Sequence, residues 1–460
     1  MSGFAGSQYD DTIVALSTAY GIGAVAMIRL SGKEAIAITQ KVFRGKNLEK
    51  VASHTVHYGH IFDQEKLIDE VMVTVLKAPR TYTREDIVEI GCHGSTFIQD
   101  QLIRVLIKAG ARLANQGEFT FRAFLNGRID LSQAEAVNDL INAENEISRD
   151  IAISQMRGGF TTQISELRQQ LIKFASLVEL ELDFSEEDVE FADRTQLEEL
   201  ILNTVKVLVG LIQSFEYGNV LRNGVPTAIV GRPNAGKSTL LNAILNEERA
   251  IVSNIAGTTR DTIEETFTLK GITFRFIDTA GIRQGGDEIE VIGIEKTFEK
   301  VKEAKMIIYL FDARDIEDFE LQEDLDDLNI DKQSLILVAN KIDKEGAENW
   351  QKKFKSFDVL GISAKKREQI EDLKERLVET VLSQNIDTSG TVVTNTRHFQ
   401  ELSEAKNALE DVLKAMQAGM TGDLLALDIR RALHALGNIT GEISTDDLLD
   451  SIFRDFCIGK

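Results

Sequence analysis

The sequence is poor in cysteine and proline, and it contains no long apolar run. Its two cysteines, Cys92 and Cys457, cannot build a disulfide framework, so we expect a reducing, cytoplasmic environment. No stretch approaches the ~18 apolar residues of a membrane helix, and the N-terminus lacks the basic-then-apolar pattern of a signal peptide. With three prolines in total, no linker is rich in proline, which favours mechanically coupled domains.

Positive charge is also scarce. Lysine and arginine number 52 against 74 aspartates and glutamates, which gives a formal net charge of −22. A body this acidic repels phosphate backbones, so tight binding of nucleic acid by the chain alone is disfavoured. Any RNA contact would need a local basic patch or a partner protein.

Residues 231–238 have the spacing G-x-x-x-x-G-K-S of a phosphate-binding loop. An expected strand at 227–230 precedes them, and an expected helix at 239–245 follows. In such a loop backbone N–H groups surround the nucleotide phosphates, Lys237 supplies a charge to the β- and γ-phosphates, and the Ser238 hydroxyl can bind Mg²⁺. The pattern recurs by chance, but three further nucleotide signals follow it in order.

The second signal is Asp278-Thr-Ala-Gly281, directly after a strand-like run at 273–277. There an aspartate can hold Mg²⁺ through water, and the Gly281 N–H can bond the γ-phosphate. The third is Asn340-Lys-Ile-Asp343, after the apolar run 335–339, where a carboxylate that accepts two guanine N–H bonds would select GTP over ATP. The fourth, Ser363-Ala-Lys365, resembles the loop that closes over guanine. Asn340–Asp343 alone would be a surface turn, but the four signals together predict GTP binding.

Residues 257–261, Gly-Thr-Thr-Arg-Asp, are typical of the first switch of GTPases, where a threonine completes the Mg²⁺ shell. Spacing alone leaves open whether Thr258 or Thr259 does so. Ile282 stands where small signalling GTPases keep the glutamine that orients the attacking water. Isoleucine cannot bond water, so either hydrolysis is poor or another group acts.

The motifs predict these GTP-binding residues: Asn234, Ala235, Gly236, Lys237, Ser238, Thr239, Thr258, Thr259, Asp278, Thr279, Ala280, Gly281, Asn340, Lys341, Asp343, Ser363, Ala364 and Lys365. Ser238 is a predicted Mg²⁺ ligand; the choice of Thr259 as the second one, and Ser253 as a further GTP-binding residue, depend on the family resemblance that the segments below carry.

The segments around the GTP motifs differ in pattern. Residues 1–130 alternate expected strands (11–17, 24–30, 71–76 and 87–91) with expected helices (34–42 and 96–108), whereas helical periodicity covers about 132–215 and 397–456. We therefore expect an α/β multidomain protein. Its parts are an N-terminal α+β domain (1–130), a discontinuous helical domain (131–223 and 384–460) and an inserted Ras-like P-loop GTPase domain (224–383).

Four segments carry a family resemblance: Gly117–Gly127, Asp130–Ala136, the Gly257–Asp261 switch and the terminal Cys457-Ile-Gly-Lys460. With the domain order, they resemble the bacterial and organellar tRNA modification GTPase family (MnmE, also called TrmE) over essentially the whole chain. The resemblance implies a constitutive homodimer. It also implies a flavin-dependent partner, MnmG (formerly GidA), in a heterotetramer that reaches tRNA and adds a carboxymethylaminomethyl or aminomethyl group to carbon 5 of the wobble uridine.

By the same resemblance the N-terminal domain is a folate-binding-like, dimer-forming domain. It takes 5-formyltetrahydrofolate or a related tetrahydrofolate derivative as the one-carbon donor, through Arg29, Glu89, Arg128 and Lys460. Without the family, Arg29 and Glu89 would simply end strands in solvent.

The resemblance also supplies an answer to the missing glutamine. It implies a K⁺ ion held by Asn234 with oxygens of Ser253, Ile255 and Thr258, GTPase domains that associate when K⁺ is present, and Glu290 as the group that positions the attacking water. Cys457 becomes a catalytic candidate whose role, nucleophile or acid, stays open, whereas Cys92 is interpreted as structural.

Two alternatives remain open. A ribosome-assembly GTPase can share the asparagine of the phosphate loop and the isoleucine of the second switch, but would carry an RNA-binding, usually basic, appendage and no Cys-Ile-Gly-Lys end. A nucleotide-gated adaptor would hydrolyse GTP slowly, only to time the assembly of a partner.

Overall fold

The computed structural model describes residues 10–143, 145–183, 194–245, 265–277, 304–328, 335–344, 349–382, 392–420, 422–443, 446–454, 456 and 459. Its contacts divide the chain into two compact units, residues 1–142 with 152–208 and 400–460, and residues 143–151 with 209–399. The domain limits expected from sequence stay predictions.

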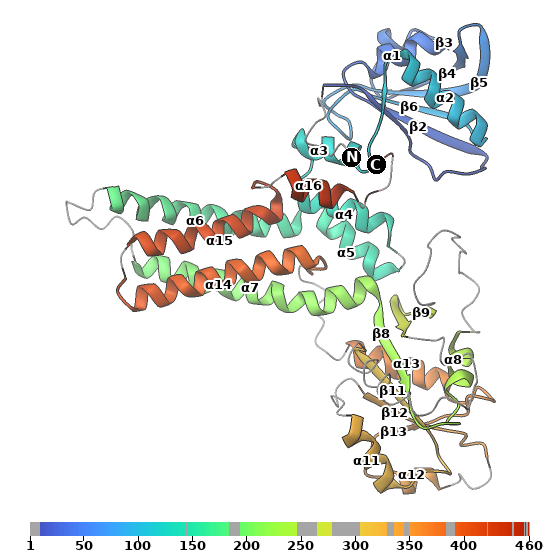
Figure 1. The fold of residues 1–460 in the computed structure, drawn as a ribbon, viewed down its shortest axis with the longest axis vertical. Helices are drawn as coiled ribbons and strands as arrows, with labels where there is room; N and C mark the ends of the chain where they lie inside the picture. The colour runs from blue at the N-terminus through green and yellow to red at the C-terminus, as the bar shows by residue number, and fades with distance from the viewer. Residues whose placement is uncertain are drawn as a thin grey trace. The chain divides into compact units, whose positions relative to one another are not determined.

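The first unit contains a seven-stranded sheet with the strand order β3-β4-β5-β6-β2-β1-β7 (Figure 1). Its neighbours pair antiparallel except β1 and β7, which are parallel. The strands are β1 (Ile13–Leu16), β2 (Val25–Ser31), β3 (Phe43–Gly45), β4 (Thr55–Asp63), β5 (Lys66–Leu76), β6 (Ile87–His93) and β7 (Arg112–Leu113).

Helices α1 (Ala35–Val42) and α2 (Thr96–Ala109) pack on the sheet through one apolar core, which includes Ile38, Leu102, Leu106 and the strand residues Val73 and Ile90. The short η2 (Leu48–Lys50) joins β3 to β4 and buries Leu48 in the same core. The alternating burial of β5 matches a strand with one covered face.

Helices α3 (Glu118–Leu125) and α4 (Leu131–Ile141) follow the sheet. A capping box begins α4, since the Asp130 side chain accepts from the Gln133 N–H and the Gln133 side chain accepts from the Asp130 N–H. The C-terminal helix α16 (Asp446–Phe453) packs back on α3, with the rings of Phe121 and Phe453 5.1 Å apart edge to face.

Long helices complete the chain, and α6 and α15 lie side by side in the first unit (Figure 1). These helices are α5 (Glu146–Met156), α6 (Gly159–Asp183), α7 (Arg194–Asn223), α14 (Thr396–Gln417) and α15 (Gly422–Thr440). The division between the units falls within α5, within α7 and within α14. In the described part of the chain, no helix is long and apolar enough to span a membrane.

The second unit contains a six-stranded sheet with the strand order β13-β12-β11-β8-β10-β9. Pairing is parallel except between β9 and β10. The strands are β8 (Val225–Val230), β9 (Glu265–Leu269), β10 (Ile272–Phe276), β11 (Met306–Asp312), β12 (Leu335–Asn340) and β13 (Val359–Gly361), and the helices are α8 (Lys237–Leu245), α11 (Asp318–Leu328), α12 (Trp350–Lys353) and α13 (Ile370–Leu382).

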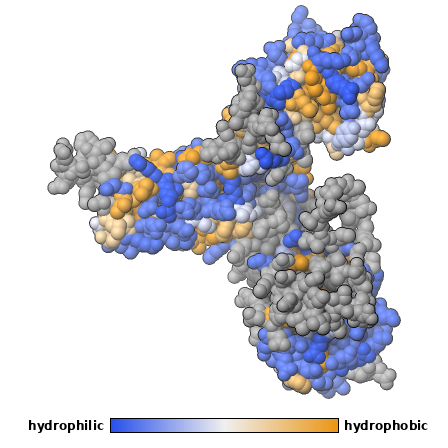
Figure 2. All heavy atoms as spheres, viewed as in Figure 1, coloured by the Kyte–Doolittle hydropathy of each residue, from blue (hydrophilic) through white to orange (hydrophobic). Residues whose placement is uncertain are grey.

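Apolar cores lie on both faces of this sheet, one containing Leu240, Phe274 and Leu373 and the other containing Phe311 and Phe354. Two covered faces explain why β8, β11 and β12 are nearly continuous apolar runs. Hydrophilic residues cover most of the described surface of this unit that Figure 2 shows.

Candidate nucleotide-binding site

The phosphate-loop residues lie between β8 and α8. Strand β8 pairs with β10 on one side and with β11 on the other. The strands that follow β8 in the chain are therefore added on opposite sides of it, and the strand order reverses at this point. Ligands of open parallel sheets bind in the crevice at the carboxyl ends of strands where the order reverses in this way. The fold therefore puts residues 231–238 where a nucleotide would bind.

Close approaches explain the two glycines of the loop. A Cβ at Gly231, whose φ is +144°, would lie 1.9 Å from the Leu310 carbonyl oxygen. A Cβ at Gly236, whose φ is +99°, would lie 2.4 Å from Asn340 Nδ2. Asn234 also has a positive φ, +59°, and is exposed. Only glycine fits the two tight positions without a shift of backbone or of the asparagine.

Lys237 opens α8, and its ammonium folds back over the loop. Nζ donates to the carbonyl oxygens of Gly231 at 2.8 Å and Arg232 at 3.0 Å. Ser238 and Thr239 are exposed in the first turn of this helix, where free N–H groups attract anions. The Ser238 hydroxyl is therefore accessible to a ligand, and its role as a Mg²⁺ ligand stays a prediction.

Asn340 joins the phosphate loop to the segment expected over guanine. Its Nδ2 donates to the Ala235 carbonyl at 2.7 Å, and its Oδ1 accepts from the N–H groups of Lys341 at 2.8 Å and Ala364 at 3.0 Å. The residue is 2% exposed. Three chain segments distant in sequence are thus held at one buried amide.

Lys341 makes a second connection to the loop. Its Nζ donates to the Asn234 carbonyl at 2.8 Å and pairs with Asp312 Oδ2 at 2.8 Å. Burial raises the pKa of the Asp312 carboxyl, but hydrogen bonds from Arg314 and Lys341 outweigh it and hold that pKa below its ordinary value. Asp312 therefore stays ionised and fixes the lysine; the sequence analysis did not include it.

Asp343 and Ser363 lie together. The Ser363 hydroxyl donates to Asp343 Oδ1 at 2.7 Å, and this bond lowers the pKa of the Asp343 carboxyl. Lys366 Nζ is 3.6 Å from Oδ2. Asp343 is thus an ionised acceptor in the segment joined by Asn340, and Lys365 beside it is exposed.

The structure brings together all the predicted GTP-binding residues that it describes. Other predicted site residues lie outside the described residues: Ser253, Ile255, Thr258, Thr259, Asp278, Thr279, Ala280, Gly281, Glu290, Cys457 and Lys460.

In the N-terminal sheet Arg29 and Glu89 face each other in register on β2 and β6, with Arg29 Nη2 2.7 Å from Glu89 Oε1. The Arg29 guanidinium lies 5.8 Å from the centre of the Phe119 ring. Burial raises the pKa of Tyr82, while its bond to Thr120 and the positive charges of Arg29 and Arg128 oppose the rise. The charges of Arg29 and Arg128 thus both act on Tyr82, while Arg29 itself is paired with Glu89 and Phe119 is fully buried.

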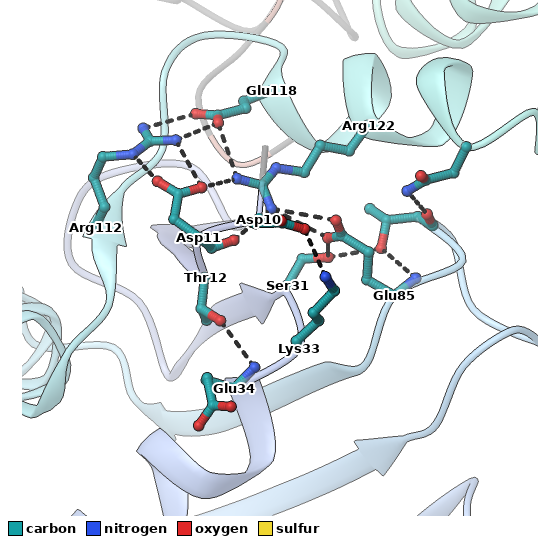
Figure 3. A network of polar contacts seen from close by, with 12 residues as sticks. Asp10, Asp11, Thr12, Ser31, Lys33, Glu34, Glu85, Arg112, Glu118 and Arg122 are labelled. Carbon is teal, nitrogen blue, oxygen red and sulfur yellow. Dashed lines mark hydrogen bonds and ion pairs between the residues drawn. The ribbon is translucent and has the colours of Figure 1, made fainter. Parts of the chain in front are cut away.

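A buried ionic network holds α3, and with it Phe119, against the sheet (Figure 3). The Arg122 side chain is 1% exposed and donates to the Asp11 carbonyl at 2.7 Å and to Glu85 Oε1 at 3.3 Å. Glu118, fully buried, pairs with Arg112 at 2.5 Å and with Arg122 at 3.3 Å. Removing one partner would leave a buried charge uncompensated, so this network fixes the position of α3.

The end of the chain reaches the same sheet. The Ser17 hydroxyl donates to the Gly459 carbonyl at 3.3 Å, and a Cβ at Gly459 would lie 2.2 Å from the Leu16 carbonyl oxygen. Cys92 is buried in β6, and burial first, then the charge of Asp69, raises the pKa of its thiol to about 11. Such a thiol is not a nucleophile at neutral pH, which agrees with the structural interpretation of Cys92.

Comparison with known proteins decides the family. A family model described as "MnmE helical domain" matches residues 131–457, and one described as "GTP-binding protein TrmE N-terminus" matches residues 12–128. The chain belongs to the MnmE family. The resemblance predicted from sequence is confirmed, and so is the MnmE architecture of an N-terminal TrmE domain, a helical domain and a P-loop GTPase domain.

Three curated MnmE relatives are similar over nearly their full length. A Cytophaga hutchinsonii protein is 55% identical over 99% of both chains, a Flavobacterium psychrophilum protein is 51% identical over 98% of this chain and 100% of its own, and a Bacteroides fragilis protein is 47% identical over 98% and 99%. Each is named a tRNA modification GTPase MnmE. The solved G domain of the T. maritima FeoB iron transporter is 29% identical over 34% of this chain and 98% of its own, with a TM-score of 0.25.

Proposed function

We propose that this protein is a K⁺-activated GTPase that works with a flavin-dependent partner to modify carbon 5 of the tRNA wobble uridine. The names of its relatives support GTP hydrolysis tied to tRNA modification. The observation that carries the nucleotide assignment is the buried Asn340 amide, which bonds both the phosphate loop and the loop beside Asp343. That linkage supports a phosphate site and a guanine acceptor that lie side by side.

Within this proposal the residues have separate roles. Lys237 and the loop N–H groups bind the phosphates, Ser238 and Thr259 hold Mg²⁺, and Asp343 accepts from guanine. Glu290 positions the attacking water. Mg²⁺, when bound, supplies positive charge beside the β- and γ-phosphates.

The K⁺ assignment rests on Asn234. Its side chain is exposed at the rim of the loop, and its own carbonyl is fixed by Lys341. An amide oxygen suits a hard cation, and Ser253, Ile255 and Thr258 would supply further oxygens. K⁺ at this place would neutralise charge that grows between the β- and γ-phosphates, a role separate from the water positioning that Ile282 cannot perform.

GTP turnover in KCl against NaCl tests this assignment. We expect strong stimulation by KCl alone, loss of that stimulation in Asn234→Ala, and unchanged binding of a fluorescent GTP analogue, because Lys237 and the loop backbone still hold the phosphates. Equal rates in the two salts would favour the slow adaptor and overturn the cation assignment.

The N-terminal surface of Arg29, Glu89 and Arg128 suits a tetrahydrofolate derivative, with a carboxylate for pterin N–H groups and guanidinium groups for the glutamate tail. The proposal keeps Lys460 as a further folate-binding residue and Cys457 as a catalytic candidate, both outside the described residues. We further propose a homodimer, a heterotetramer with the partner, contact with tRNA through that complex, and a cytoplasmic location where tRNA is modified.

Mass spectrometry of wobble uridines from a deletion strain separates this function from ribosome assembly. Loss of the carbon-5 group, restored by the wild-type gene, is the expected result. Intact wobble uridines together with a ribosome-assembly defect would favour the alternative.

A further inference from the structure

Arg232, the second residue of the phosphate loop, pairs with acidic side chains of α11. Its Nε donates to Asp324 Oδ2 at 2.7 Å and its Nη2 to Asp324 Oδ1 at 3.1 Å. Nη1 donates to Glu320 Oε1 at 3.3 Å. The two parallel bonds to Asp324 form a fork that fixes direction as well as distance.

Asp324 is itself held by a tyrosine of β11. The Tyr309 hydroxyl donates to Asp324 Oδ2 at 2.5 Å, and Tyr309 is 2% exposed in β11. Burial first, then the Asp324 carboxylate, raises the pKa of Tyr309, so the hydroxyl remains a donor. Tyr309 pairs with Val230, the residue directly before the loop. The contacts therefore close a ring from β8 through the loop to α11, to β11 and back.

This ring meets Lys237 at the backbone. Lys237 donates to the carbonyl of Gly231, which follows Val230, and to the carbonyl of Arg232, whose side chain is anchored on α11. Gly231 is pressed on the Leu310 carbonyl, which fixes the loop at one end. The Arg232–Asp324 fork fixes the next residue along the loop, so both carbonyls belong to anchored residues.

We propose that Arg232 and Asp324 are positioning residues for nucleotide binding: their fork holds the two carbonyls that orient the Lys237 ammonium. The inference rests on the proposed function, since it takes GTP and GDP as the ligands of the loop. In this role Arg232 does not contact phosphate, because its guanidinium is bonded to two carboxylates on α11.

The test measures dissociation of a fluorescent GDP analogue from the full chain by stopped flow. The variants are Arg232→Gln, Asp324→Asn and the two combined. We expect each single change to speed dissociation about tenfold, because each breaks a charge-assisted bidentate contact. The double variant should be no faster than the faster single one, since both remove the same interaction.

Asp326→Asn is the matched control. It makes the same chemical change on the same helix, but Asp326 is exposed and bonds Gln322 instead of Arg232. Its dissociation rate should equal that of the wild type. Circular dichroism at the assay temperature reports folding. Arg232→Lys keeps the positive charge but cannot form the two parallel bonds to Asp324, so it too should speed dissociation. It serves as the second test if Asp324→Asn does not fold.

The outcomes separate the possibilities. A wild-type rate in folded Asp324→Asn or Arg232→Lys overturns the positioning role. Fast dissociation in Arg232→Gln alone, with a normal Asp324→Asn, means that Arg232 contacts the nucleotide directly and overturns it too. No binding of the analogue by the wild type overturns the proposed function and this inference with it, whereas normal wild-type binding with unaffected variants overturns only the inference.

Discussion

At Asp343 one carboxylate carries the proposed choice of base. Asp343→Asn replaces an acceptor with a side chain that also donates, opposite guanine's own donors, so GTP affinity should fall by about 10²-fold while xanthosine triphosphate gains relative to GTP. Competition binding with the two nucleotides measures this.

Ser363→Ala is the control, since it removes the hydroxyl bonded to Asp343 and keeps the charge of Asp343. It should weaken GTP less and leave the preference between bases unchanged. Unaltered GTP affinity in Asp343→Asn would reduce residues 340–343 to a turn.

Sequence alone could name candidate nucleotide-binding side chains, but not the residues that hold those side chains in place. Lys237, Asn340 and Asp343 belong to short local patterns, because phosphate and guanine recognition need fixed spacings. Asp312 and Asp324 belong to no such pattern, because their partners Lys341 and Arg232 are distant in sequence. Arg29 and Glu89 illustrate the same limit, since their ion pair depends on the register of β2 with β6.

At the scale of elements, α7 offers a matched pair of glycines. A Cβ at Gly218 would lie 2.2 Å from the Val393 carbonyl oxygen, in the segment before α14, whereas a Cβ at Gly210 would meet nothing within 4 Å. Gly218→Ala should therefore lower the free energy of unfolding by about 1–3 kcal/mol through overpacking. Gly210→Ala should raise it by about 0.5–1 kcal/mol through helix propensity.

Denaturant titration followed by circular dichroism measures both changes. Equal effects of the two substitutions would contradict close packing of α7 on Val393. That packing, with the Phe215 and Phe399 rings 4.6 Å apart and the Ser214 hydroxyl accepting from the Val393 N–H at 3.1 Å, joins the two segments that enter and leave the second unit's sheet.

The elements that sequence predicted share one property, a strong local signal. The apolar run 335–339 lies in β12, and the expected helices 34–42 and 96–108 agree with α1 and α2 within a few residues. Strand β4 was not predicted, because a glycine and two histidines interrupt its apolar alternation. Strand β11 was not predicted either, since periodicity cannot distinguish a short continuous apolar run in a strand from one in a helix.

At the scale of the whole molecule, charge decides how tRNA can be reached. A net charge of −22 opposes a polyanion at every distance within the Debye length, so the chain by itself should bind tRNA more weakly than about 10⁻⁶ M at physiological salt. Addition of the flavin-dependent partner should tighten binding, because the partner would supply the basic surface that this chain lacks overall.

Fluorescence anisotropy of labelled tRNA at two KCl concentrations checks this expectation. For this chain alone the affinity should be low at both concentrations, and for the complex it should fall as KCl rises, since counterions are released where phosphates meet basic groups. Tight, strongly salt-dependent binding by this chain alone would contradict the argument, because it would require a basic patch large enough to overcome the surrounding acidic surface. Neutralising Arg128 would then show whether that patch is the surface around Arg29, Tyr82 and Arg128 in the N-terminal domain.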